Sequence, residues 1–178
     1  MITVQLAKTS QDAVATIRET SATLLARART FAWLAIAFAD AGLLLWGALT
    51  VIAPQCPGAC MTNGYETFTS QSWADLAAAS DSTANFLLLL FRVFGAYNVA
   101  FGFLGIAVAA TAFRRGEAWA WWALLIANTL AYGSAMTYDR MVGFIGTNEM
   151  LEYVCIAGVF AAAAVTAPMQ ALHGRPRK

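Results

Sequence analysis

The fold of this chain is decided by residues 85–113, NFLLLLFRVFGAYNVAFGFLGIAVAATAF, in which Arg92 is the one charged residue. About 20 consecutive apolar residues suffice for an α-helix to cross a bilayer, so this segment predicts a membrane-spanning helix. Three further apolar stretches of this kind lie at 31–53, 118–137 and 151–167. The sequence therefore predicts an all-α integral membrane protein, a four-helix bundle whose domain covers residues 30–168.

The composition of the whole chain agrees with a membrane location. Of its 178 residues, 60% are hydrophobic and 12% are charged, whereas a soluble domain has about 45–50% apolar and about 25% charged residues. A chain of this composition cannot cover a water-facing surface, but it suits a lipid-facing one. The net charge of +1 provides no basic field for nucleic acid, so we expect no nucleic-acid partner.

The orientation follows from the Lys and Arg residues that flank the predicted spans. Four lie in segment 1–29, two in the connector 114–117 and three in the tail 169–178. Segments 54–84 and 138–150 together contain one. We therefore expect both termini on the cytoplasmic side (N-in/C-in). The Arg- and Ala-rich composition indicates a bacterial source, so we expect a multi-pass protein of the bacterial inner membrane.

Segment 1–29 is polar, and its apolar residues recur at helical spacing. Its apolar residues fall on one side of a helical wheel and its charged residues on the other, which predicts an amphipathic helix. The apolar side consists of Leu6, Ala13, Val14, Ile17, Leu24 and Leu25. Such a helix either lies at the membrane surface or packs on the protein's own cytoplasmic loops. The domain 30–168 and a basic cytoplasmic tail, 169–178, follow it.

Polar residues inside the predicted spans are the best candidates for a functional site, because each costs free energy unless it is paired or hydrated. The candidate ligand-pocket residues are Asp40, Arg92, Asn98, Asn128, Tyr132 and Glu152. Glycines 95, 102 and 105 share one face of their helix with Asn98 and permit close helix approach. Arg92 lies at the edge of that face, so we expect it to point into the outer half of the bundle. It would form a salt bridge there with Glu152, Asp139 or Glu149, or face a ligand.

Asp40 lies near the middle of the first span. Its carboxyl is expected to be protonated, to be hydrogen-bonded to Asn98 or Asn128, or to belong to a proton or ion path. A pocket with such a polar floor suits an amphipathic ligand such as a quinone, an isoprenoid, a sterol-like molecule or a lipid. The alternative is a packed bundle with interhelical hydrogen bonds and no cavity.

The predicted outer loop 54–84 contains Cys56 and Cys60 in the sequence CPGAC. On the oxidising side of the membrane this pair predicts a structural disulfide. The alternative is a redox pair that exchanges electrons with a quinone. The single histidine, His173, excludes bis-histidine haem ligation by this chain alone, and we predict no metal site. No cofactor is predicted beyond a bound quinone or lipid.

Two short motifs carry a resemblance to a known group: FRVFG at 91–95, and RRGEAW at 114–119. With these motifs, residues 31–167 resemble the small four-helix bacterial membrane proteins called DoxX-like. The resemblance implies a four-helix bundle, and some members are associated with quinone-linked sulfur oxidation or redox partners. The long loop with its cysteines departs from a minimal member, and no functional residue is carried over.

Three functions are consistent with these features. The first is a protein that binds a hydrophobic ligand, or an accessory subunit that associates with membrane lipids and with other membrane subunits or further copies of itself. The second is a membrane enzyme with a lipophilic substrate, in which Asp40, Arg92 and Glu152 act as acid, anion clamp and base. The third is a thiol–quinone redox protein that uses Cys56 and Cys60.

Overall fold

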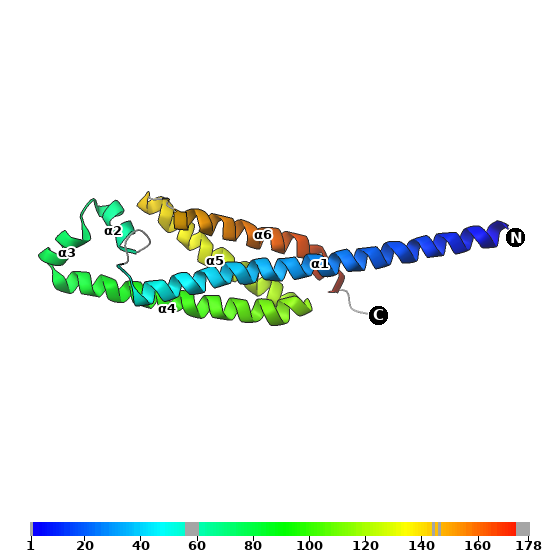
Figure 1. The fold of residues 1–178 in the computed structure, drawn as a ribbon, viewed down its shortest axis with the longest axis horizontal. Helices are drawn as coiled ribbons and strands as arrows, with labels where there is room; N and C mark the ends of the chain where they lie inside the picture. The colour runs from blue at the N-terminus through cyan, green and yellow to red at the C-terminus, as the bar shows by residue number, and fades with distance from the viewer. Residues whose placement is uncertain (1, 56–60, 144, 146, 174–178) are drawn as a thin grey trace.

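The computed structural model of this chain describes residues 2–55, 61–143, 145 and 147–173, and these contain helices and turns but no strand. Figure 1 shows the arrangement of the helices. In chain order they are α1 (Ile2–Ile52), α2 (Met61–Thr69), α3 (Trp73–Ala79), α4 (Asp81–Val108), the π-helical turn η1 (Ala109–Phe113), α5 (Ala118–Val142) and α6 (Thr147–His173). The predicted all-α class is confirmed.

Three helical segments among the described residues are long and apolar enough to cross a membrane. They are Glu19–Ile52, Asp81–Phe113 and Glu149–Ala167. Helix α5 has 25 residues, which gives a length of about 37 Å, but it is not among the three. Polar groups such as those of Asn128 and Tyr132 lower its hydropathy. The fourth span, the closed bundle and its orientation therefore stay predictions.

Helix α1 is the central element, because it packs along both α4 and α6, while α5 packs on α6. Small residues allow the closest of these approaches. A Cβ atom added at Gly47 of α1 would lie 2.5 Å from the carbonyl oxygen of Gly95 in α4. One added at Gly102 or Gly105 would overlap Asp40 of α1. The glycine face predicted for α4 is thus its interface with α1.

The N-terminal segment differs from the prediction of a separate surface helix over 1–29. Helix α1 continues without a break from Ile2 to Ile52, and its N-terminal part projects beyond the other helices (Figure 1). The physical reason is the absence of helix-breaking residues: no proline precedes Pro54 and no glycine precedes Gly42. The segment and the first span are therefore one rod.

The predicted outer loop 54–84 is more structured than expected, because its described part contains helices α2 and α3. Each of the two serines beside α3 caps a helix. Ser72 accepts a hydrogen bond from the backbone N–H of Asp75 at the start of α3, and Ser80 accepts one from Thr83 at the start of α4. These caps place α3 directly before α4, so the segment packs against the end of the helical body.

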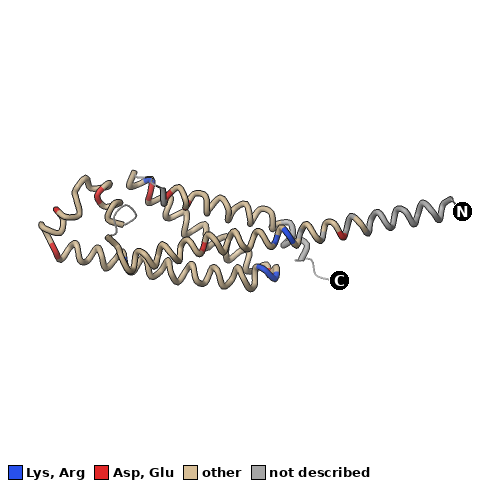
Figure 2. The backbone as a smooth tube through the Cα atoms, in the orientation of Figure 1, with Lys and Arg blue, Asp and Glu red and all other residues tan. Residues whose placement is uncertain are grey.

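The opposite end of the helical body carries basic residues (Figure 2). Arg115 forms a salt bridge to Glu117 at 2.8 Å, and Arg114 lies over the ring of Trp33, 5.4 Å from its centroid. Hydrogen bonds from Trp119 and Arg115 hold the pKa of Glu117 below its ordinary value. Acidic residues gather at the other end of the helical body, the one beside α2 and α3 (Figure 2). The charge asymmetry predicted from the sequence therefore separates the two ends of the fold.

Candidate functional site

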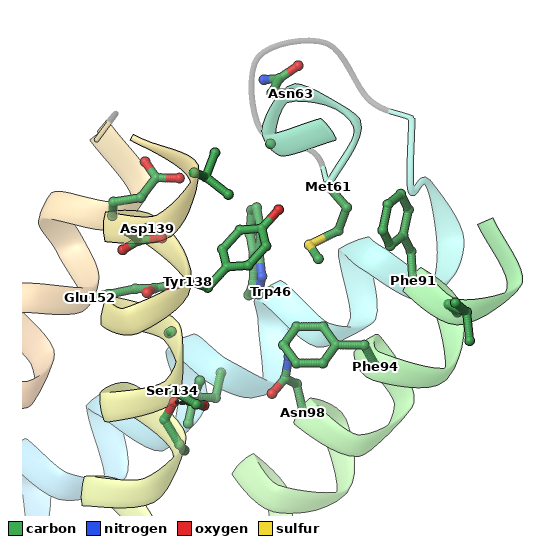
Figure 3. A pocket seen from close by; sticks show the side chains of 17 residues that line it. Trp46, Met61, Asn63, Phe91, Phe94, Asn98, Ser134, Tyr138, Asp139 and Glu152 are labelled. Carbon is green, nitrogen blue, oxygen red and sulfur yellow. Dashed lines mark hydrogen bonds between the residues drawn. The ribbon is translucent and has the colours of Figure 1, made fainter. Parts of the chain in front are cut away.

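A cavity of about 410 Å³ lies at the acidic end, between α1, α2, α4, α5 and α6 (Figure 3). It exists because α1 holds α4 on one side and α6 on the other, while α4 and α5 scarcely touch. Three small residues of α5, Ala131, Ser134 and Ala135, line this space instead of filling it. Helix α2 closes the cavity from above.

Helix α2 is seated by a glycine. Gly64 is buried, and a Cβ atom added there would overlap the hydroxyl oxygen of Tyr138 in α5. Glycine at this position lets α2 pack directly on the Tyr138 side chain, which any larger residue would have to displace. Met61 and Asn63 of the same helix line the cavity, so the position of α2 determines the shape of its upper part.

One side of the cavity is apolar and aromatic. Trp46 of α1, Leu90, Phe91 and Phe94 of α4, and Met61 form it (Figure 3). Phe91 is held in place by Trp73 of α3, whose ring centroid lies 6.1 Å away. Walls of this kind are typical of pockets for drug-sized or lipid-like molecules.

The other side carries carboxylates from α5 and α6: Asp139, Glu149 and Glu152. Asp139 is only 6% exposed. Its Oδ2 atom and the Oε2 atom of Glu152 are buried without a hydrogen-bond partner among the described residues. Burial and the nearby Glu149 carboxylate raise the pKa of Asp139, and a hydrogen bond with Tyr153 opposes this shift. No Lys, Arg or His is among the described residues that line the cavity.

Of the predicted site residues, Asn98 and Glu152 line this cavity, but Arg92 does not. The Arg92 side chain is exposed and forms no salt bridge among the described residues. The predicted pairing of Arg92 with Glu152, which would lock α4 to α6, is therefore wrong. The reason is that α1 lies between α4 and α6. The glycine face of α4 meets α1, and Arg92 at its edge stays outside.

Asp40, Asn128 and Tyr132 form a separate cluster deeper in the protein. All three are at most 2% exposed. Tyr132 donates a hydrogen bond to the carbonyl oxygen of Ala39 at 2.8 Å, and Asn128 Nδ2 donates to Leu124 O at 3.0 Å. The Asp40 carboxyl lies against Gly105 and beside Asn128. Both of its oxygens and Asn128 Oδ1 have no hydrogen-bond partner among the described residues.

Asp40 thus lies beside Asn128, but the expected hydrogen bond between them is not formed among the described residues, and this cluster does not line the large cavity. A smaller cavity of about 70 Å³ lies between the two sites. Tyr132, Cys155 and Glu152 line it together with Trp46. Glu152 and Trp46 thus face both cavities, and the predicted single polar-floored pocket is divided into an outer cavity and a buried cluster.

The sequence reasoning missed the aromatic wall and the role of α2. It considered Asp139 and Glu149 only as partners of Arg92. A signal was present in the pair Tyr138 and Asp139, because adjacent polar residues near the end of a span mark a site where the helix leaves lipid. No comparable signal identified Trp46 or Met61, whose place on the wall depends on helix packing.

Cys56 and Cys60 lie outside the described residues, so both the disulfide and the redox pair stay predictions. Cys155 is a buried free thiol. Among the described residues, no group of three or more His, Cys, Asp or Glu side chains is arranged to hold a metal ion.

The fold and the site together define a helical protein with membrane-spanning-type helices and a partly apolar, partly acidic cavity at one end. No protein-family model, no curated protein and no solved structure matches this chain. The resemblance to DoxX-like proteins therefore stays a prediction.

Proposed function

We propose that this chain is a small integral membrane protein, a four-helix bundle with both termini in the cytoplasm, that binds a hydrophobic ligand in its outer cavity. One observation carries the proposal: a cavity of about 410 Å³ that five helices enclose and apolar and aromatic side chains line on one side. This volume falls within the range of about 300–1,000 Å³ that is usual for ligand pockets.

The cavity favours binding over the predicted enzyme. The three side chains expected to act together point to separate places: Asp40 is buried against Gly105, Arg92 is exposed and Glu152 lines the cavity. An acid, an anion clamp and a base must converge on one reacting group. The redox alternative depends on Cys56 and Cys60 and gains no support from the described residues.

An accessory role in a larger complex is supported by a different observation. The N-terminal part of α1 projects beyond the other helices (Figure 1), and Thr23, Leu24 and Ala26 within it are exposed. A projecting helix offers a surface for another subunit or for a second copy of this chain.

Native mass spectrometry after gentle extraction tests the ligand-binding proposal. We expect the wild-type protein to retain a lipid-like molecule. We expect Ala135→Phe to lose it, because Ala135 lines the cavity and a phenyl group would occupy the space. Ala123→Phe is the matched control, since Ala123 is exposed on the same helix. Recovery of all three proteins without any bound molecule would remove the support for a ligand-binding function.

A further inference from the structure

The charged side chains among the described residues that line the outer cavity are all of one sign. Three carboxylate side chains, Asp139, Glu149 and Glu152, lie along α5 and α6, and the described lining includes no basic residue. The nearest basic residue in the sequence, Arg140, is exposed, follows Asp139 in α5 and is not part of the lining. One wall of the cavity therefore carries carboxylates, and the described lining contains no basic side chain.

Two of these carboxylates have an unsatisfied oxygen. Asp139 is 6% exposed, and its Oδ2 atom has no hydrogen-bond partner among the described residues. The same holds for Oε2 of Glu152, deeper along the wall. A buried carboxylate oxygen without a donor is costly. A group that brings positive charge or N–H donors into the cavity would remove this cost.

The opposite wall is suited to an organic cation. Trp46, Phe91 and Phe94 present aromatic rings, and Tyr138 lies between them and the carboxylates (Figure 3). Aromatic faces attract ammonium-type cations, most strongly where water is excluded. A bare metal ion is not favoured, because the described side chains include no group of three or more metal-ligating residues that converge on one point.

We propose that the outer cavity binds a lipophilic organic monocation, an ammonium or phosphonium with apolar substituents, whose charge faces Glu152 and Asp139 while its substituents contact Trp46, Phe91 and Phe94. This inference rests on the proposed ligand-binding function and specifies the chemical class of the ligand. The carboxylates provide the charge selectivity, and the aromatic wall provides the contact area.

The test uses radiolabelled tetraphenylphosphonium in equilibrium dialysis with the full-length protein in an uncharged detergent. Neutral tetraphenylsilane, which has the same four phenyl groups around a tetrahedral centre, is measured in the same way as the matched uncharged compound. Binding to the cavity is defined as the part lost in Ala135→Phe, which excludes partition into the micelle. The variants are Glu152→Gln, which removes a wall carboxylate, and Glu19→Gln, which removes an exposed carboxylate far from the cavity.

We expect tetraphenylphosphonium to bind the cavity at least about tenfold more tightly than tetraphenylsilane, because only the cation is attracted by the carboxylates and by the faces of the aromatic rings. Glu152→Gln should weaken tetraphenylphosphonium binding by at least about tenfold, because it removes one of the attracting charges, and Glu19→Gln should leave it unchanged. If Glu152→Gln does not fold, Asp139→Asn and Glu149→Gln provide the same comparison, since both residues lie on the same wall.

The two possible failures are distinguishable. Equal cavity binding of both compounds, insensitive to Glu152→Gln, would overturn the cation preference while the ligand-binding function stands. If neither compound shows binding that Ala135→Phe removes, both the cation preference and the proposed function are overturned.

Discussion

The close contact between α1 and α4 at Gly47 predicts a difference in stability between two glycine-to-alanine variants of α1. At Gly47, an added Cβ would lie 2.5 Å from Gly95 O, 2.7 Å from Val99 N and 2.8 Å from Asn98 Cβ. Two of these are backbone atoms of α4, so rotation of a side chain cannot relieve the overlap. At Gly42, five residues earlier, nothing lies within 4 Å of the same added atom.

The magnitude follows from these distances. Ordinary van der Waals contact begins at about 3.5 Å, so Gly47→Ala must move α1 and α4 apart by roughly 1 Å. Overpacking of this kind costs about 1–3 kcal/mol of unfolding free energy. Gly42→Ala gains up to about 1 kcal/mol, because alanine is the better helix former. Gly47→Ala gains the same helix propensity, so we expect the two variants to differ by the overpacking cost, about 1–3 kcal/mol in stability.

Thermal unfolding in one detergent, followed by circular dichroism, measures this difference with Gly42→Ala as the matched control. Both variants add one methyl group to the same helix, so the change in intrinsic helix propensity cancels between them. Equal stability of Gly47→Ala and Gly42→Ala would refute the close approach of α1 to α4.

Three further variants test other contacts. The Asp40 carboxyl accepts no hydrogen bond from the described residues. We therefore expect the unfolding free energy of Asp40→Asn to lie within about 1 kcal/mol of wild type, whereas Asp40→Ala should lose about 2 kcal/mol more through lost packing. Equal losses of the two variants in thermal unfolding would contradict this. Gly64→Ala should lower stability, because the new Cβ overlaps the hydroxyl of Tyr138. Adding Tyr138→Phe to that variant should restore stability, and a double variant without this rescue would argue against the contact. Burial raises the pKa of Asp139 in the folded state, so between the unfolded and the folded pKa the folded protein binds more protons than the unfolded chain. This residue therefore lowers stability as the pH rises through that window, and its cost is complete above the folded pKa. We expect Asp139→Asn to flatten that pH dependence and to raise the melting temperature at neutral pH, and a steeper dependence in the variant would refute the assignment.

Local features of the sequence determined the helical class and the contact surface of α4. Long apolar stretches leave the backbone no partner except its own helical hydrogen bonds in lipid, so the segments around 31–53, 85–113 and 151–167 were recognisable without a structure. The spacing of Gly95, Gly102 and Gly105 likewise predicted a face for close approach, because helical periodicity is a property of the chain itself.

The composition of the candidate site depended on which helix is central. With α1 between α4 and α6, Arg92 remains outside, and Glu152 faces a cavity instead of a guanidinium group. The same arrangement separates Asp40, packed on Gly105, from the outer cavity. Nothing in the spacing of these polar residues distinguishes this packing from one in which α4 touches α6.

The sequence alone therefore determined the helical segments, the glycine face of α4 and the opposite charges of the two ends, because each depends on residues close together in the chain. Only the tertiary structure decided that α2 covers a cavity and that the Asp139–Glu152 wall faces aromatic rings. Those outcomes depend on contacts between helices distant in sequence, where a single glycine such as Gly47 sets how closely two backbones approach.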